Sequence, residues 1–263
     1  ADLGGAKLAE MHKRMGAAQY ANLGGAKLAD MSKNMAFTQF NDLGGSKVAD
    51  MTKTMALAQF QDLGGAKLVD MTKTMDATHF ENLGGSKVAD MTKTMELKEF
   101  ADLGGSKVAD MAKTMGSEEY SELGSTRVRD MAVTMQPGDL QGVGKGALEA
   151  ITKELPSEGI NSLGSDRVEV MVKGVDVTTL REVGTGTLGN MRDVMLVDQI
   201  GESKAWEELS SECIGTFTKD QKTRFSYYGN NEGDVFVNVI VYGKYESKPK
   251  PYNLKRSPEK CNT

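Results

Sequence analysis

The fold is decided by three consecutive stretches, NDLGGSKVADMTKTMALAQF (41–60), QDLGGAKLVDMTKTMDATHF (61–80) and ENLGGSKVADMTKTMELKEF (81–100). The same 20-residue pattern covers residues 1–200, with a glycine at the fourth position of all ten units and no insertion. Apolar residues recur at positions 3, 8, 11, 15 and 20 of each unit. A unit this short cannot bury an apolar face alone, so neighbouring units must stack. The sequence predicts a solenoid of ten repeats.

Each unit is predicted to be a helical hairpin. Val48, Met51 and Met55 lie at i, i+3 and i+7, which places them on one stripe of a helix. A second, shorter helix is predicted from about position 17 to position 2 of the next unit. There, Pro137 and the run Ser117-Glu118-Glu119 are typical of a helix start, with Ser117 as the cap residue. The predicted fold class is therefore mainly α, a superhelix of short helix, glycine turn and longer helix.

The unit at 141–160 shows a recognisable hairpin. Leu140-Gln141-Gly142-Val143-Gly144-Lys145, followed by Leu148 and Ile151, resembles the helix-hairpin-helix motif. The resemblance implies two helices joined by a glycine hairpin that contacts the DNA backbone without regard to sequence. The turn residues expected from it are Gly44, Gly64, Gly84, Gly104, Gly142 and Gly144. A leucine-rich repeat is the rival interpretation, but its strand, with closely spaced leucines and an asparagine, is missing.

The pattern ends at residue 200, so residues 1–200 and 201–263 are predicted to be separate domains. Residues 202–212 have helical spacing and are expected to cap the solenoid, and 223–228 and 234–245 are expected to be strands. Cys213 and Cys261 bracket this β-rich module, and a disulfide between them would close a loop of about 50 residues. A disulfide favours an oxidising compartment and thus a secreted or cell-surface protein. Two unrelated buried thiols are the alternative.

Composition excludes several functional classes. The net charge is −5, which argues against a protein dedicated to binding phosphate backbones. No apolar run is long enough to span a membrane. His12 and His79 are isolated, and the sequence offers no Ser-His-Asp, Cys-His or paired-carboxylate arrangement. We expect no metal, no cofactor and no enzymatic activity.

A row of basic residues at position 7 forms the candidate contact site for an anion or a partner. Each follows a hairpin, where the amides at a helix N-terminus favour anions. The row consists of Lys7, Lys27, Lys47, Lys67, Lys87, Lys107 and Arg127. The favoured alternative is a solvated salt-bridge face, because acids lie three residues after the lysines. If the row binds nucleic acid, changing Lys47, Lys67, Lys87 and Lys107 together to glutamate should weaken binding while the fold survives.

All 17 methionines lie at position 11 or 15. Pairs at i, i+4 could bind Cu(I) through their thioethers. Core packing is the favoured interpretation, because Ile151 and Leu155 take the same two positions in one unit.

The sequence therefore favours a non-enzymatic, secreted or surface repeat scaffold that binds a protein or polymer partner, as yet unspecified, through an extended repetitive surface. Sequence-independent nucleic-acid binding through the glycine and lysine row is the alternative. Methionine-based Cu(I) binding is a third, less favoured one.

Overall fold

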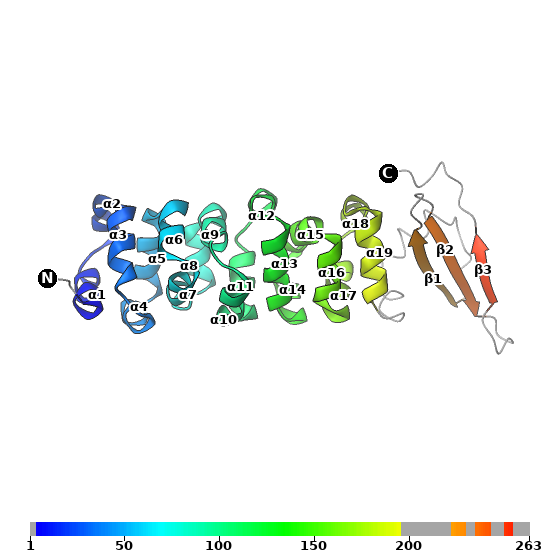
Figure 1. The fold of residues 1–263 in the computed structure, drawn as a ribbon, viewed down its shortest axis with the longest axis horizontal. Helices are drawn as coiled ribbons and strands as arrows, with labels where there is room; N and C mark the ends of the chain where they lie inside the picture. Colours follow the sequence, from blue (N-terminus) through cyan, green and yellow to red (C-terminus); the bar gives the residue numbers. More distant parts are fainter. Residues whose placement is uncertain (1–3, 196–221, 230–234, 243–249, 255–263) are drawn as a thin grey trace. The chain divides into compact units, whose positions relative to one another are not determined.

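The computed structural model describes residues 4–195, 222–229, 235–242 and 250–254, and short and long helices alternate in the first of these ranges (Figure 1). The short helices are α2 (Ala17–Leu23), α4 (Phe37–Leu43), α6 (Leu57–Leu63), α8 (Ala77–Leu83), α10 (Leu97–Leu103), α12 (Ser117–Leu123), α14 (Pro137–Gly142), α16 (Ser157–Leu163) and α18 (Val177–Glu182). The long helices are α1 (Gly5–Lys13), α3 (Gly25–Lys33), α5 (Gly45–Thr54), α7 (Gly65–Thr72), α9 (Gly85–Thr92), α11 (Gly105–Ala112), α13 (Ser125–Thr134), α15 (Lys145–Glu154), α17 (Ser165–Gly174) and α19 (Gly184–Val194). The prediction of repeated helical units is confirmed.

The glycine at position 4 joins the short helix to the long one. From Gly24 to Gly184 its φ lies between +77° and +89°, a region that side-chain-bearing residues rarely adopt. Five of the expected turn glycines, Gly44, Gly64, Gly84, Gly104 and Gly144, occupy this position. Gly142 does not, because it is the last residue of α14.

The residue at position 19 caps the start of its own short helix. Gln59 Oε1 accepts the N–H of Ala56 at 2.9 Å, and Glu119 Oε2 accepts the N–H of Gly116 at 2.9 Å. Ser117, expected to be the cap residue, is instead the first helical residue of α12. A long acceptor side chain at position 19 therefore satisfies an amide that would otherwise have no intrahelical partner.

Backbone contacts divide the chain into two compact units, residues 1–150 and 151–263. In the first unit each helix packs against the helix three places further along, as in α1 with α4, α2 with α5 and α3 with α6. Each repeat holds two helices, so one turn of the coil, which contains three helices, corresponds to one and a half repeats. Neighbouring repeats therefore stack, but not through equivalent helices: each long helix packs against the short helix of the next repeat, and each short helix packs against the long helix two repeats further on.

This geometry produces three columns of helices. One column contains α1, α4, α7, α10 and α13, a second contains α2, α5, α8, α11 and α14, and a third contains α3, α6, α9 and α12. Along the lower side of Figure 1, α4, α7 and α10 follow one another, and α6, α9 and α12 follow one another along the upper side. A given repeat position returns to the same column only in every third repeat, after two turns of the coil.

The core is built from the predicted apolar positions and from small residues beside them. In the repeat 61–80, Leu68, Met71, Met75 and Phe80 are buried, and so is Thr72 at position 12. The leucine at position 3 is only half-buried in this repeat. Burial of these side chains is the main source of stability.

The glycine at position 5 lets successive turns approach closely. A Cβ added at Gly45 would lie 2.5 Å from the Thr74 carbonyl oxygen, and one added at Gly85 would lie 2.6 Å from the Thr114 carbonyl oxygen. Both distances are too short for a real contact, so glycine is required here for steric reasons rather than for its backbone angles.

In the second unit α16 packs against α19, and Asn190 Nδ2 donates to the Ser157 carbonyl oxygen at 2.7 Å. Three antiparallel strands, β1 (Lys222–Gly229), β2 (Val235–Tyr242) and β3 (Lys250–Leu254), pair in the order β1-β2-β3. The expected cap over residues 202–212 and both cysteines, Cys213 and Cys261, lie outside the described residues. The β-rich capping module, its disulfide and the domain boundary at residue 200 stay predictions.

Candidate partner-binding surface

The structure places most of the position-7 bases against the main chain of the preceding turn. Lys67 Nζ donates to the carbonyl oxygen of Met35, 32 residues earlier, at the end of a long helical segment. Lys47, Lys87 and Lys107 make the same bond to Met15, Met55 and Met75. Arg127 Nε donates to the Lys93 carbonyl oxygen at 2.8 Å. A cation at a helix C-terminus satisfies carbonyl groups that the helix leaves without partners.

These bonds occupy the ammonium groups that an anion would need. The four lysines are half-buried, whereas Lys7 and Lys27, which belong to the first two repeats, are exposed. The geometry thus favours a structural role for the interior part of the row, and an anion or partner contact there stays a prediction.

A second lysine row, at position 13, lies on the exterior. Lys33 Nζ is 2.5 Å from Asp62, and Lys93 Nζ is 2.7 Å from Glu122, each acid lying 29 residues further on. These are solvent-accessible ion pairs between adjacent turns, worth about 0–1 kcal/mol each. They match the exposed salt-bridge face that the sequence favoured, but they use position 13 rather than position 7.

Exposed residues vary between repeats at positions 16 to 18, and also at position 1, which reads Ala, Asn, Gln, Glu and Ala. Across residues 21–120, positions 3–5, 7, 10, 11, 13 and 15 are identical in all five repeats. Positions 16 to 18 instead read Ala-Phe-Thr, Ala-Leu-Ala, Asp-Ala-Thr, Glu-Leu-Lys and Gly-Ser-Glu. We call residues 36–38, 56–58, 76–78, 96–98 and 116–118 the variable surface. All are exposed except Leu57 and Ala77, which are half-buried.

Two large apolar side chains stand out on the variable surface. Phe37 is 40% exposed and Leu97 is 45% exposed. They begin α4 and α10, which belong to one column with α7 between them. With about 8–10 Å between packed helices, the two side chains start about 16–20 Å apart on the same face. Leu57 holds the same repeat position on α6, in another column.

The structure also brings together a serine, a histidine and an aspartate. Asp76 Oδ1 lies 2.6 Å from His79 Nδ1, and His79 Nε2 lies 3.1 Å from Ser46 Oγ. The order matches the Ser-His-Asp arrangement of hydrolases, and the sequence concealed it because Ser46 is 33 residues from His79. The expectation from the sequence that His79 is isolated is therefore wrong.

Helix capping accounts for the contacts between Asp76 and His79, and the contact with Ser46 has a counterpart in another repeat. The Asp76 N–H lies 3.2 Å from His79 Nδ1, the bond that a position-19 glutamine or glutamate makes in other repeats. Ser106 Oγ donates to Asp139 Oδ1 at 3.0 Å in the same two positions. The group is thus a cap that links successive turns, and we assign it no catalytic role.

His12 is completely buried, and neither ring nitrogen has a hydrogen-bond partner among the described residues. Burial lowers its pKa, because the charged ring would lose its hydration. Its ring centroid lies 5.6 Å from that of Tyr20, whose pKa burial raises to about 12, so the neighbouring phenol is neutral.

Because the pKa of His12 is lower in the folded chain than its ordinary value near 6.5, the unfolded chain binds more protons in this range, so stability should fall as the pH drops below 6.5. We expect a loss of up to about 2 kcal/mol between pH 7.5 and 5, measured by urea unfolding. His12→Thr, which installs the residue found at Thr52, should remove this pH dependence. His79→Gln, which keeps the cap, should leave it unchanged. If the stability of His12→Thr falls with decreasing pH as steeply as that of the wild-type chain, the pH dependence does not come from His12.

Neither a metal site nor a membrane span emerges from the described residues. The interior methionines Met51, Met71, Met91 and Met111 are fully buried as core side chains. Among the residues described, no group of three or more His, Cys, Asp or Glu could hold a metal ion, and no helix is long and apolar enough to cross a bilayer.

No protein-family model, curated protein or solved structure matches this chain. The assignment of function therefore depends on the geometry described above.

Proposed function

We propose that the chain is a non-enzymatic repeat scaffold that binds a partner protein through the variable surface. The observation that carries the proposal is the separation of constant from variable positions. Invariant or conservatively exchanged residues form the core and the turns, whereas the exposed residues at the starts of the short helices differ from repeat to repeat. In repeat proteins, a constant framework with varied exposed positions is how one architecture presents a specific binding surface.

The column that contains α4, α7 and α10 is the best candidate for the contact face. Phe37 and Leu97 supply exposed apolar side chains of the kind that dominate protein interfaces. Of the other two columns, one carries Ala77 at position 17, and the other carries Ser117 and the half-buried Leu57. Each repeat advances the coil by two thirds of a turn, so consecutive repeats place position 17 on different columns. Each column therefore presents its own set of side chains, and a partner would bind one of these three faces.

Location outside the cell or on its surface is part of the proposal. It is supported by the two cysteines that bracket residues 213–261. Nucleic-acid binding through the position-7 row is the second candidate, supported by its helix-hairpin-helix resemblance. The carbonyl contacts of Lys47, Lys67, Lys87 and Lys107 and the net charge of −5 place it behind protein binding. If the chain does not bind duplex DNA at low salt, nucleic-acid binding is excluded.

The test uses the full chain immobilised on beads and extracellular proteins as the probe, with quantitative mass spectrometry as the readout. The Phe37→Glu/Leu97→Glu variant should lose at least one retained protein by about tenfold or more. Leu57→Glu, the matched change on another column, should retain it. Equal retention by all three chains, or no protein retained above the bead control, would contradict the proposal.

A further inference from the structure

The column that contains α4, α7 and α10 carries three exposed apolar side chains at the starts of its helices. Phe37 begins α4, Leu97 begins α10, and Ala66 is the second residue of α7. All three are exposed. We call Phe37, Ala66 and Leu97 the apolar strip.

Two contacts place the start of α7 between the starts of α4 and α10. Lys67 Nζ donates to the carbonyl oxygen of Met35, which precedes α4. A Cβ added at Gly65 would lie 2.8 Å from Cγ of Glu99, in the first turn of α10. Because Ala66 lies between Gly65 and Lys67, its methyl group is at the middle of the apolar strip. The strip is therefore lower at its centre than at its two ends, where the larger side chains lie.

The residue at the centre of the apolar strip differs from its counterparts on the other columns. In the first unit, Ser46 and Ser106 of the second column and Ser86 of the third column occupy the same repeat position between two short helices. The Ser46 hydroxyl lies 3.1 Å from His79 Nε2. A serine hydroxyl loses hydrogen bonds to water when an apolar group covers it, whereas the Ala66 methyl group loses none. The centre of the apolar strip is thus suited to an apolar side chain of a partner.

An α-helix with an apolar face matches the dimensions of the apolar strip. The separation of about 16–20 Å between Phe37 and Leu97 corresponds to about 11–13 residues of helix. Eleven residues make about three turns, so two residues at this spacing lie on one face of a helix and can contact both ends of the strip. A large apolar residue between them fits over Ala66, as a knob fits a hole in helix packing. An extended peptide usually pairs with a sheet edge, and the described part of this column consists of helices.

The charges beside the apolar strip favour a different protein over a second copy of this chain. Glu96 and Lys98 flank Leu97 and are exposed, whereas the residues on either side of Phe37 are uncharged. A two-fold contact would set Leu97 opposite Phe37 of the second copy and remove these charges from water without partners, which costs free energy. A partner helix can instead place a basic and an acidic residue beside Glu96 and Lys98.

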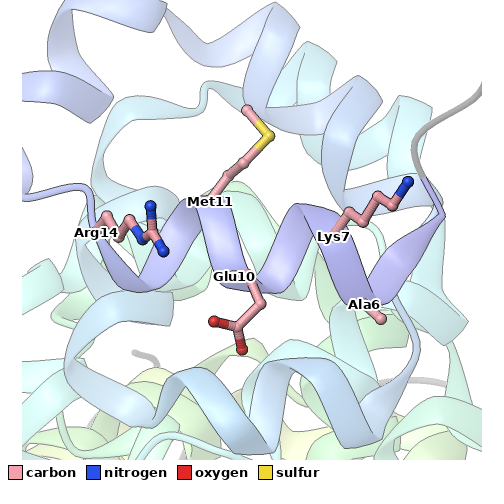
Figure 2. A pocket seen from close by; sticks show the side chains of 5 residues that line it. All are labelled: Ala6, Lys7, Glu10, Met11 and Arg14. Carbon is pink, nitrogen blue, oxygen red and sulfur yellow. The ribbon is translucent and has the colours of Figure 1, made fainter.

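The shallow groove on α1 fits an apolar helix face less well. It is lined by Ala6, Lys7, Glu10, Met11 and Arg14 (Figure 2). Lys7, Glu10 and Arg14 are charged, and Glu10 Oε1 lies 2.7 Å from Lys13 Nζ. An apolar face would remove these charges from water without replacing their hydration. The apolar strip carries no charge between its two ends.

We infer that the apolar strip binds an amphipathic α-helix of the partner protein, with one large apolar residue of that helix over Ala66. This inference rests on the proposed function, which places the partner on the same column, and adds the secondary structure that the column recognises. Ala66 then determines specificity, because a longer side chain at this position would fill the space that the central residue of the partner needs.

Selection of helical peptides on the immobilised full chain tests this inference. The probe is a display library of peptides of about 18 residues, with a helix-forming Ala, Glu and Lys framework and one randomised face. A second library is identical except for a central proline, which breaks the helix. The helical library should yield binders with a large apolar residue at the centre of the randomised face.

Variants of the chain then locate the bound peptide, with fluorescence anisotropy as the readout. Ala66→Leu and Phe37→Glu/Leu97→Glu should each weaken binding by about tenfold or more. Ala26→Leu is the matched control, because it makes the same change at an exposed alanine in the same repeat position on α3, in the third column. It should bind the peptide as tightly as the wild-type chain does.

The inference is overturned if the helical library yields no binder, if only the proline library yields binders, or if Ala66→Leu binds the selected peptides as tightly as the wild-type chain. A dimer that Leu97→Glu dissociates in sedimentation velocity would show that a second copy occupies the strip, and would also overturn it. The bead experiment separates this failure from failure of the proposed function. A protein lost from Phe37→Glu/Leu97→Glu but retained by Ala66→Leu would leave the proposed function intact and overturn only the helix inference.

Discussion

Changing Lys47, Lys67, Lys87 and Lys107 together to glutamate is expected to destabilise the chain by about 4–8 kcal/mol, from about 1–2 kcal/mol at each site. Each substitution removes a donor to the carbonyl oxygen of a methionine that ends a long helical segment, and sets a carboxylate beside the negative end of that helix. The total is comparable to the whole stability of a typical domain. The fold should therefore not survive intact, contrary to what the nucleic-acid interpretation expected from sequence.

Urea unfolding followed by circular dichroism measures this effect. The matched control changes four exposed lysines at position 13, Lys13, Lys53, Lys73 and Lys113, to glutamate, with the same change in net charge. The control should lose far less stability, because ion pairs in solvent contribute little. Equal stability of the two variants would show that the position-7 ammonium groups do not bind the main chain, and would restore that row as an anion site.

Gly45→Ala is expected to destabilise the chain by about 1–3 kcal/mol, although alanine is normally the better residue in a helix. The added Cβ would lie 2.5 Å from the Thr74 carbonyl oxygen and 2.8 Å from His79 Cε1. The main-chain carbonyl cannot move without shifting the next turn of the coil. The cost is therefore overpacking between turns rather than a local backbone effect.

Gly138→Ala provides the comparison, because a Cβ there meets nothing within 4 Å in α14. It should be neutral or slightly stabilising, as expected for removing a helical glycine. The midpoints of thermal unfolding of the two variants separate the effects. A Gly45→Ala chain as stable as Gly138→Ala would mean that successive turns are not in contact at position 5.

Much of the helical hairpin could be predicted from local sequence. The stripe of apolar residues and the proline at residue 137 are local signals, and they identified the long and short helices. The long helix is shorter than the stripe predicted, because Val48 and Met51 lie in α5 whereas Met55 is its extended C-cap residue. The buried Thr52, which donates to the Val48 carbonyl oxygen at 2.7 Å, was not predicted as a core residue. A polar threonine is expected at the surface, and the sequence does not show that a local hydrogen bond satisfies its hydroxyl in the core.

The stacking could not be predicted in the same way, because it depends on how far the coil turns per repeat. A 20-residue period gives the helices but not their partners, so the bond from Lys67 to a carbonyl 32 residues earlier has no sequence signature. The contact between Ser46 and His79 was hidden for the same reason. The variable surface, by contrast, has a sequence signature, because the repeats differ from one another at positions 16 to 18.

The central claim is that one turn of the coil comprises one and a half repeats, and zero-length carbodiimide coupling of the native full chain, followed by peptide mass spectrometry, tests it most directly. Coupling joins an amine and a carboxylate that are already in contact. The structure predicts products that join Lys33 to Asp62 and Lys93 to Glu122, each pair separated by 29 residues. Products between residues three or four apart would form in any helix. Long-range products that join only lysines and carboxylates about 20 residues apart, one repeat length, would show that equivalent helices of consecutive repeats stack directly, and would contradict this arrangement.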